Sequence, residues 1–395
     1  MATSSAVNIL NYGAVGNGIK DDSLAFSKAW SDTCNSVANQ STLLVPSGHT
    51  FLVQPLTFTG PCKSPNLYFQ LEGGVIAPGG PEKWKIKAQS LISFENVSGL
   101  TLDGYGTING LGKGWWDLSC AHHPKLKGCY DRRPTTLTFI YCTRIRVNNI
   151  FMINSPQVHI LVWYGNDVKF DSVSINSPAL SPNTDGIHIE DSKNVSVFHS
   201  VIKAGDDCIS IGDQSFHILI VNIFCGPGHG ISIGSLGRDG EEVKVENIQV
   251  HRANFFGTTN GVRIKTYQVM YTLKFININL VGKGIVQHVG FKNLTFHNVE
   301  NPIIIDQHYC FDPNGCPDLP TAVHIDDVKF QGAIGTSASE VAMNLNCSKS
   351  VPCTNINFKN IRLKPAKSLK RIKSSCNNAY GSNTGTVKPS SCLHS

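Results

Sequence analysis

The sequence predicts an all-β protein built as a single parallel β-helix, a solenoid of stacked coils, with a short capping helix near its N-terminus. The main observation is a repeat, because apolar β-branched strings begin at Gly186, Cys208 and Gly230, at intervals of 22 residues. A coil of this length cannot bury its inner face alone, so neighbouring coils must stack and share one core. The second observation is that hairpin signals, which a propeller or sandwich would show between strands, do not separate the strings.

The elements of this solenoid can be placed in chain order. Residues 1–6 are expected to be a leader remnant, 7–365 the β-helix domain and 366–395 a C-terminal tail. A helix around Asp22 to Asn35 would cap the first coil. Many strings begin with Asn, which suits tight turns because it tolerates the left-handed conformation. Further strand-like strings lie at 98–107, 137–155, 261–264, 302–305, 322–330 and 354–363.

Composition and charge exclude several classes of protein. Hydrophobic residues make up 41% and charged residues 16% of the 395 positions, so disorder is excluded. No apolar run approaches the roughly 18 residues that span a bilayer, which excludes a transmembrane segment. The net charge of +6 fits an anionic partner, but no basic run with interleaved aromatics indicates nucleic acid. Because the helix and the tail would cover the two ends of the solenoid, we expect a monomer.

Thirteen cysteines favour an oxidising compartment. Zinc binding is the alternative, but the repeated C-x2-C or H-x3-H spacing of zinc sites is missing. Five N-x-S/T sequons also fit a secreted, extracellular protein. Cys142 is left over as a buried free thiol. The expected disulfides are Cys34–Cys62, Cys120–Cys129, Cys208–Cys225, Cys310–Cys316, Cys347–Cys353 and Cys376–Cys392, and the sequon asparagines are Asn39, Asn96, Asn194, Asn293 and Asn346.

The register of the coils brings polar residues together at one edge of the solenoid. Asp185, Asp207 and His229 each precede one of the three strings. Because adjacent strands lie about 4.8 Å apart, these residues should form a row. Asp206 shares the outward parity of its strand and should face solvent. Strict alternation would point Asp185 and Asp207 inward, so we expect a turn or bulge to redirect them.

This group of side chains is typical of acid–base chemistry. Neighbouring carboxyl groups cannot all ionise easily, so one can act as an acid and another as a base, as glycoside hydrolysis requires. Arg263 and Lys265, two residues apart on the next string, add two positive charges. Aspartates that only cap turn amides and a calcium site are the alternatives. The two cations oppose calcium and favour an anionic ligand such as a uronate carboxylate.

Four ordered motifs resemble the signature of the polygalacturonases, glycoside hydrolase family 28. The resemblance covers most of the chain, from Asn11-Tyr-Gly-Ala14 to the Cys376/Cys392 tail. The motifs are Asn183-Thr-Asp-Gly186, Gly205-Asp-Asp-Cys208, Gly228-His-Gly230 with Ser232-Ile-Gly-Ser235, and Arg263-Ile-Lys265.

The resemblance implies a right-handed parallel β-helix that hydrolyses α-1,4-galacturonosyl bonds of pectin with inversion, and without a metal or other cofactor. Asp206 would be the general acid, and Asp185 and Asp207 would activate the attacking water. His229 would tune the acid by a hydrogen bond. The substrate-binding residues would be Arg263 and Lys265, which hold the substrate carboxylate, and Tyr309, which helps to place the sugar.

One segment departs from the family pattern. Residues 268–283 replace a short Gly/Ser-rich link with a longer apolar stretch beside Arg263 and Lys265. We hypothesise that this stretch is a gene-model artefact, which its detection as a peptide of the mature protein would rule out. If it is genuine, the alternative function is an inactive or weakly active relative that binds wall polysaccharide. A pectin lyase-type enzyme is a third hypothesis, but elimination would require calcium and an arginine base. Exo and endo action both remain open.

Overall fold

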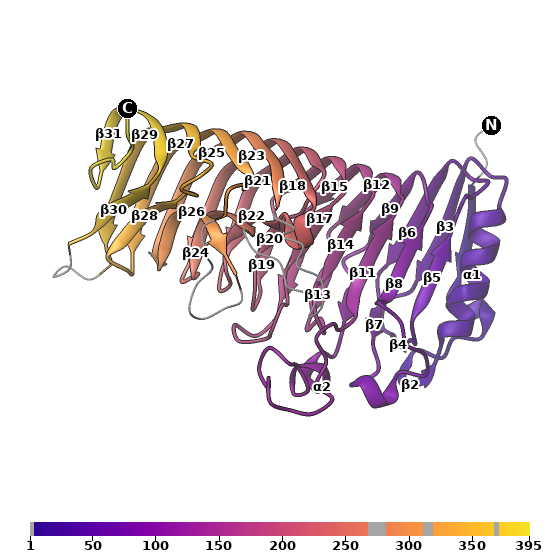
Figure 1. Cartoon of the computed structure of the whole chain (residues 1–395). Helices are drawn as coiled ribbons and strands as arrows, with labels where there is room; N and C mark the ends of the chain where they lie inside the picture. Colours follow the sequence, from indigo (N-terminus) through magenta and orange to yellow (C-terminus); the bar gives the residue numbers. More distant parts are fainter. Residues whose placement is uncertain (1–3, 268–281, 311–318, 367–370) are drawn as a thin grey trace. The chain divides into compact units, whose positions relative to one another are not determined.

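The structure is a computed structural model that describes residues 4–267, 282–310, 319–366 and 371–395 (Figure 1). Two compact units divide the chain. The N-terminal unit comprises Met1–His188 and Ser192–Asp206, and the C-terminal unit comprises Ile189–Asp191 and Asp207–Ser395. In both units the regular secondary structure is mainly parallel strands. The predicted fold class, a right-handed parallel β-helix, is confirmed.

The strands of the N-terminal unit form three rows, and most of its coils contribute one strand to each row. Within every row the strands pair in parallel. The first row contains β1 (Ser4–Asn8), β3 (Gln40–Val45), β6 (Asn66–Leu71), β9 (Leu100–Asp103), β12 (Thr143–Asn148), β15 (Asn166–Asp171) and β18 (Lys193–Phe198). The second contains β2 (Asn17–Asp21), β4 (Thr50–Leu52), β7 (Gly74–Ile76), β10 (Thr107–Asn109), β13 (Phe151–Ile153), β16 (Ser174–Asn176) and β19 (Val201–Lys203). The third contains β5 (Leu56–Thr59), β8 (Ser90–Glu95), β11 (Thr135–Ile140), β14 (Ile160–Trp163) and β17 (Ile187–Glu190).

The core of this unit is a set of apolar columns. In the third row, Phe58, Phe94, Phe139 and Val162 occupy equal register positions and are fully buried or nearly so. Burial of one such side chain contributes about 1.5–3 kcal/mol. Because every coil covers the inner face of its neighbour, the stack is stable only as a whole.

Helix α1 (Ser23–Asn35) lies against the first coils, beside β1, β3 and β5 (Figure 1). Its buried face includes Trp30, whose indole N–H donates to the Thr59 carbonyl at 3.2 Å. The predicted helix is confirmed, although it begins one residue later, at Ser23. Asp22 instead accepts hydrogen bonds from the backbone N–H groups of Val15 and Gly16. The remaining helical turns are η1 (Ile9–Tyr12), η2 (Pro81–Lys83), α2 (Lys113–Trp116) and, in the C-terminal unit, η3 (Arg238–Gly240).

Each coil of the C-terminal unit contributes one long strand and one shorter strand. Strands of both kinds pair in parallel with their counterparts. The long strands are β21 (Ser215–Cys225), β23 (Glu242–Phe256), β25 (Lys283–Val299), β27 (His324–Ser337), β29 (Cys353–Pro365) and β31 (Ala379–Lys388). The shorter strands are β20 (Ile209–Ile211), β22 (Ile231–Leu236), β24 (Asn260–Tyr267), β26 (Asn301–Tyr309), β28 (Val341–Asn346) and β30 (Lys373–Asn377).

The strings of the sequence repeat form the core of this unit. Ile211, Ile233, Ile264, Ile305 and Leu345 align in register and have no exposed surface. Strands β30 and β31 pair with β28 and β29, so residues of the expected tail continue the coils.

Disulfides reinforce both units. Five of the six expected pairs are present: Cys34–Cys62, Cys120–Cys129, Cys208–Cys225, Cys347–Cys353 and Cys376–Cys392. Cys310 is also disulfide-bonded, and its expected partner Cys316 lies outside the described residues. Cys142 is a buried free thiol, as expected. None of the helices in the described residues has the length and hydrophobicity needed to span a membrane.

Candidate active site

Asp185 lies in the segment between β16 and β17, two residues before β17 begins and two after the turn at Pro182 and Asn183. Its backbone carbonyl accepts two hydrogen bonds from His159, one from the main-chain N–H at 2.9 Å and one from Nδ1 at 2.8 Å. Because a carbonyl only accepts, Nδ1 must carry the proton, and Nε2 then accepts from the Ser177 hydroxyl at 2.8 Å. Burial lowers the pKa of His159 to about 4. A neutral imidazole therefore anchors the turn that carries Asp185.

Asp206 lies in the next turn, which is joined to the first by hydrogen bonds. Asn183 donates from Nδ2 to Asp206 Oδ2 at 3.2 Å. The Thr184 hydroxyl oxygen accepts from the backbone N–H of Gly205 at 2.9 Å. A side chain at Gly205 would collide with the carbonyl of Ser181, so only glycine allows the two turns this close approach. Asp206 is half-buried, and the close packing at Gly205 and the hydrogen bond from the Asn183 amide both help to fix its position.

Asp207 is held by charges. It lies in the bend before β20 with only 1% of its surface exposed. Arg263 Nη2 lies 2.8 Å from Asp207 Oδ1, and Lys265 Nζ lies 3.0 Å from Oδ2. The Ser232 hydroxyl donates to Oδ1 at 2.8 Å and accepts from Arg263 Nε at 3.0 Å. The bend that the sequence requires at Asp207 is present, and both cations of the Arg263-Ile-Lys265 motif form ion pairs with this carboxylate.

Tyr309 ends β26 beside the same cations. The Lys265 ammonium lies 5.3 Å from the centre of the Tyr309 ring, within the range of a cation–π contact. Tyr267 packs edge-on against Tyr309, with ring centres 5.2 Å apart. These contacts fix the orientation of the Tyr309 ring next to the Asp207–Lys265 ion pair.

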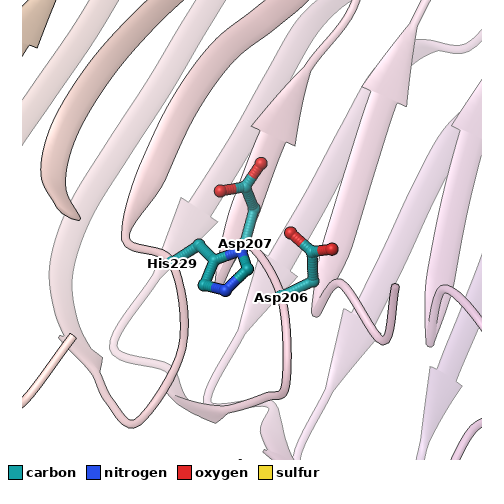
Figure 2. A group of neighbouring side chains, drawn as sticks. All are labelled: Asp206, Asp207 and His229. Atoms are coloured by element: carbon teal, nitrogen blue, oxygen red, sulfur yellow. The ribbon is translucent and has the colours of Figure 1, made fainter. Parts of the chain in front are cut away.

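Asp206, Asp207 and His229 form one group of neighbouring side chains (Figure 2). One potential ligand atom from each lies within 4.8 Å of the others. Carboxylate and imidazole groups at this spacing could in principle hold a cation. However, Asp207 is already paired with Arg263 and Lys265, and a third positive charge beside them would be repelled. The expectation that the site uses no metal stays a prediction.

The strand register placed Asp206, Asp207 and His229 near one another, and the structure groups these three side chains (Figure 2). The place of Asp185 in this group stays a prediction. The sequence did not identify the residues that hold these side chains. Ser232 lies within the third motif, but the motif did not indicate that it donates to Asp207. His159 and Arg133 lie outside the four motifs. Arg133 is 50 residues from Asn183, its hydrogen-bond partner, so no local spacing could have indicated the contact.

The comparisons with known proteins agree with this geometry. The family model described as glycosyl hydrolases family 28 matches residues 34–389. A "Probable polygalacturonase" of Arabidopsis thaliana is 41% identical over 388 residues, covering 98% of this chain and 84% of that protein. A polygalacturonase of Persea americana is 42% identical over 358 residues, covering 90% of this chain and 73% of that protein.

Solved structures show the same fold at lower identity. The endo-xylogalacturonan hydrolase of Aspergillus tubingensis has a TM-score of 0.80 at 24% identity, over 96% of this chain and 100% of that one. An exopolygalacturonase of Thermotoga maritima has a TM-score of 0.78 at 20% identity, over 96% and 90%. From the family match and the full-length relatives it follows that the chain belongs to glycoside hydrolase family 28 and is a glycoside hydrolase.

Proposed function

We propose that this protein is a polygalacturonase that hydrolyses α-1,4-galacturonosyl bonds of pectin with inversion of configuration. The observation that carries the proposal is the group of Asp206, Asp207 and His229, with Arg263 and Lys265 paired to Asp207. Two carboxyl groups in different electrostatic surroundings supply the acid and the base that glycoside hydrolysis needs. The names of the relatives at about 40% identity support pectin as the substrate.

Asp206 is the proposed general acid. Its partner Asn183 is neutral, so nothing in this contact opposes a protonated carboxyl group. His229, which offers a ring nitrogen within 4.8 Å of a carboxylate oxygen of Asp206, is the residue proposed to tune the acid. Asp207 is the proposed base together with Asp185, since its two cations favour the carboxylate form that activates water.

Arg263, Lys265 and Tyr309 are the proposed substrate-binding residues. A guanidinium group has five N–H donors, so Arg263 can bind a uronate carboxylate in addition to Asp207. Lys265 lies between Asp207 and the Tyr309 ring and can contribute in the same way. The Tyr309 ring offers a flat face on which a sugar can pack.

We infer that the protein works outside the cell, in the wall, as a monomer that binds neither nucleic acid nor a membrane. The disulfides support an oxidising compartment, because such bonds are rare in the cytosol. The sequons fit the same route.

The test is digestion of polygalacturonic acid in EDTA, following new reducing ends, product sizes and the anomer formed first. Early monomer means exo action, and a ladder of oligomers means endo action. Asp206→Asn should abolish the signal, whereas Asp131→Asn, at an exposed position, should leave it unchanged. Binding of polygalacturonate without new reducing ends would overturn the proposal in favour of the wall-binding relative. The segment 268–283 that motivates this alternative lies, apart from Gly282 and Lys283, outside the described residues.

A further inference from the structure

We propose that Arg133 is a positioning residue which, through Asn183, determines which oxygen of the Asp206 carboxyl group carries the catalytic proton. The inference rests on the proposed role of Asp206 as the general acid. All three residues belong to the N-terminal unit.

Arg133 is buried, and each of its three side-chain nitrogens has an oxygen acceptor. Only 5% of its surface is exposed. Nε donates to the Pro156 carbonyl at 3.1 Å, and Nη1 donates to the Ser119 hydroxyl at 2.7 Å and the Tyr130 carbonyl at 3.2 Å. Nη2 donates to the Pro182 carbonyl and to Asn183 Oδ1, both at 3.0 Å. Burial lowers the pKa of Arg133, but a guanidinium group remains charged and can only donate.

This donor fixes the orientation of the Asn183 amide. An asparagine can place either its oxygen or its nitrogen toward a partner. Because Arg133 Nη2 must donate, Asn183 Oδ1 must face it, and Nδ2 must face Asp206. Asp206 Oδ2 therefore accepts a hydrogen bond, and when the carboxyl group is protonated the proton belongs on Oδ1. A reversed amide would place a carbonyl oxygen beside Oδ2 and draw the proton to the wrong side.

The acceptors of Arg133 come from three separate segments, so its position is well determined. Ser119 and Tyr130 flank the loop closed by the Cys120–Cys129 disulfide. Pro156 precedes β14, and Pro182 belongs to the turn that carries Asp185. The disulfide-closed loop thereby supports the acid through Arg133 and Asn183.

The test is a double-mutant cycle. In Arg133→Lys, the ammonium cannot reach both Pro182 and Asn183 in the same fork, so we expect kcat to fall about tenfold or more with KM within about twofold. Asn183→Asp should also lower kcat, and the added charge should move the alkaline limb of the pH–rate profile to higher pH. In the Asn183→Asp background there is no amide to orient, so Arg133→Lys should change kcat by less than about twofold. Arg132→Lys, at the neighbouring exposed position, is the matched control.

Equal losses from Arg133→Lys in both backgrounds would mean a purely structural role and would overturn the proposal. If the wild type proves inactive on polygalacturonate, the role of Arg133 can still be tested by following the titration of 13Cγ-labelled aspartates by NMR. The proposal then requires Arg133→Lys to shift the titration midpoint of Asp206 in the Asn183 protein only. An unchanged midpoint would contradict it.

A separate observation leads us to infer that Asn96 carries an N-linked glycan whose first N-acetylglucosamine packs on Tyr141. The sequon Asn96-Val-Ser98 lies in a left-handed turn, and Asn96 is exposed. Glu95, Ile140 and Trp163 are aligned in register, so the residues that follow them, Asn96, Tyr141 and Tyr164, form a row.

Tyr141 and Tyr164 make a flat apolar platform beside the sequon. Their rings are 4.6 Å apart with an angle of 3° between the planes, and 55% and 40% of their surfaces are exposed. The apolar face of a pyranose ring packs well on an aromatic ring. Among the sequon asparagines, Asn194 instead donates to Asn166, and Asn346 donates to Asp306.

This inference rests on secretion, and peptide mapping of the secreted protein before and after glycosidase treatment tests it. We expect Asn96 to be occupied. Tyr141→Ala should lower the melting temperature of the glycosylated protein by about 2 °C more than that of Asn96→Gln, which lacks the glycan. Tyr105→Ala, at another exposed tyrosine, should show no such difference. If glycans are found at other sequons but not at Asn96, the proposed glycosylation site is wrong. If Tyr141→Ala lowers the melting temperature equally with and without the Asn96 glycan, the proposed packing on Tyr141 is wrong. If no sequon is occupied in an active enzyme, the secretory part of the proposed function fails.

Discussion

The two units hold their aspartates by different means. In the N-terminal unit, the Asn183 amide donates to the Asp206 carboxyl group, and a buried imidazole of low pKa holds the backbone carbonyl of Asp185. In the C-terminal unit, two cations hold Asp207. Neutral partners tolerate a protonated carboxyl group, whereas cations favour the ionised form. The comparison teaches that surroundings, rather than residue type, distinguish Asp206, the proposed acid, from Asp207, one of the two proposed bases.

The largest expected effect comes from removing one of the cations. Lys265→Met would remove one of the two cations paired with the buried Asp207 carboxylate, and breaking a buried pair costs about 3–5 kcal/mol. We expect a loss of that size in the free energy of unfolding, measured with urea, and a large fall in kcat. Lys292→Met, at an exposed position, should change stability by less than about 0.5 kcal/mol. A loss below about 1 kcal/mol for Lys265→Met would mean that the charges do not hold Asp207.

Asp213 is the exception within the C-terminal unit, because it is a buried carboxyl group without a cation. Its Oδ1 has no hydrogen-bond partner among the described residues. Burial, followed by repulsion from Glu241, raises its pKa to about 7. The folded state therefore binds this proton more tightly than the unfolded state, whose pKa is near 3.8. The stability it contributes is full below about pH 3.8 and is lost as the pH rises toward 7.

Asp213→Asn should remove the loss of stability that accompanies ionisation of Asp213 as the pH rises. We expect the variant to be more stable than the wild type at pH 7.5 by roughly 2–4 kcal/mol, with little difference at about pH 4. Urea unfolding at several pH values measures the effect. A variant that follows the pH dependence of the wild type would show that Asp213 is ionised in the folded protein at low pH.

His159 gives the opposite pH dependence in the N-terminal unit. Burial lowers its folded pKa to about 4, below its ordinary value of 6.5. Its contribution to the free energy of unfolding is full above about pH 6.5 and is lost as the pH falls toward 4. His159→Asn keeps an N–H donor for the Asp185 carbonyl but does not titrate, so this loss on acidification should disappear.

His159→Leu removes the side-chain donor, and only the main-chain N–H of residue 159 can then donate to the Asp185 carbonyl. At about pH 7 we expect it to cost about 1–3 kcal/mol, more than His159→Asn, because buried hydrogen-bonding groups lose their partner. Thermal unfolding and kcat of the two variants provide the comparison. If the two variants are equally active, the side-chain hydrogen bond at position 159 is not needed to position the turn that carries Asp185.

The smallest effect is expected for a surface pair of the N-terminal unit. Arg146 and Asp167 lie 2.9 Å apart, with 38% and 47% of their side chains exposed. Asp167→Asn should cost no more than about 0.5 kcal/mol, and less in high salt, because exposed ion pairs contribute little. A loss comparable to that of Lys265→Met would contradict the view that burial gives the C-terminal ion pairs their importance.

The sequence predicted the features that follow from the coil repeat, but it did not predict the individual side-chain contacts of the site. The Ile columns follow from the 22-residue spacing, and the register placed Asp207 near Arg263 and Lys265. It could not predict that both cations pair with Asp207, because strand spacing alone does not choose between a carboxylate of the protein and one of the substrate.

The difference between three-strand and two-strand coils was also invisible in the sequence. Asn149 separates β12 from β13 and Asn222 lies inside β21, although both have a positive φ, 50° and 59°. Whether a strand ends or continues at such a corner depends on the backbone hydrogen bonds of the neighbouring coils.

The buried thiol of Cys142 has a practical consequence. It is the free cysteine of the described chain, it is fully buried between coils of the N-terminal unit, and burial raises its pKa to about 11. A thiol reagent can modify it only after those coils part, since the reactive thiolate is both enclosed and scarce. The rate at which a thiol reagent labels Cys142 in the intact protein therefore measures how often the N-terminal unit opens spontaneously. This measurement needs no engineered probe.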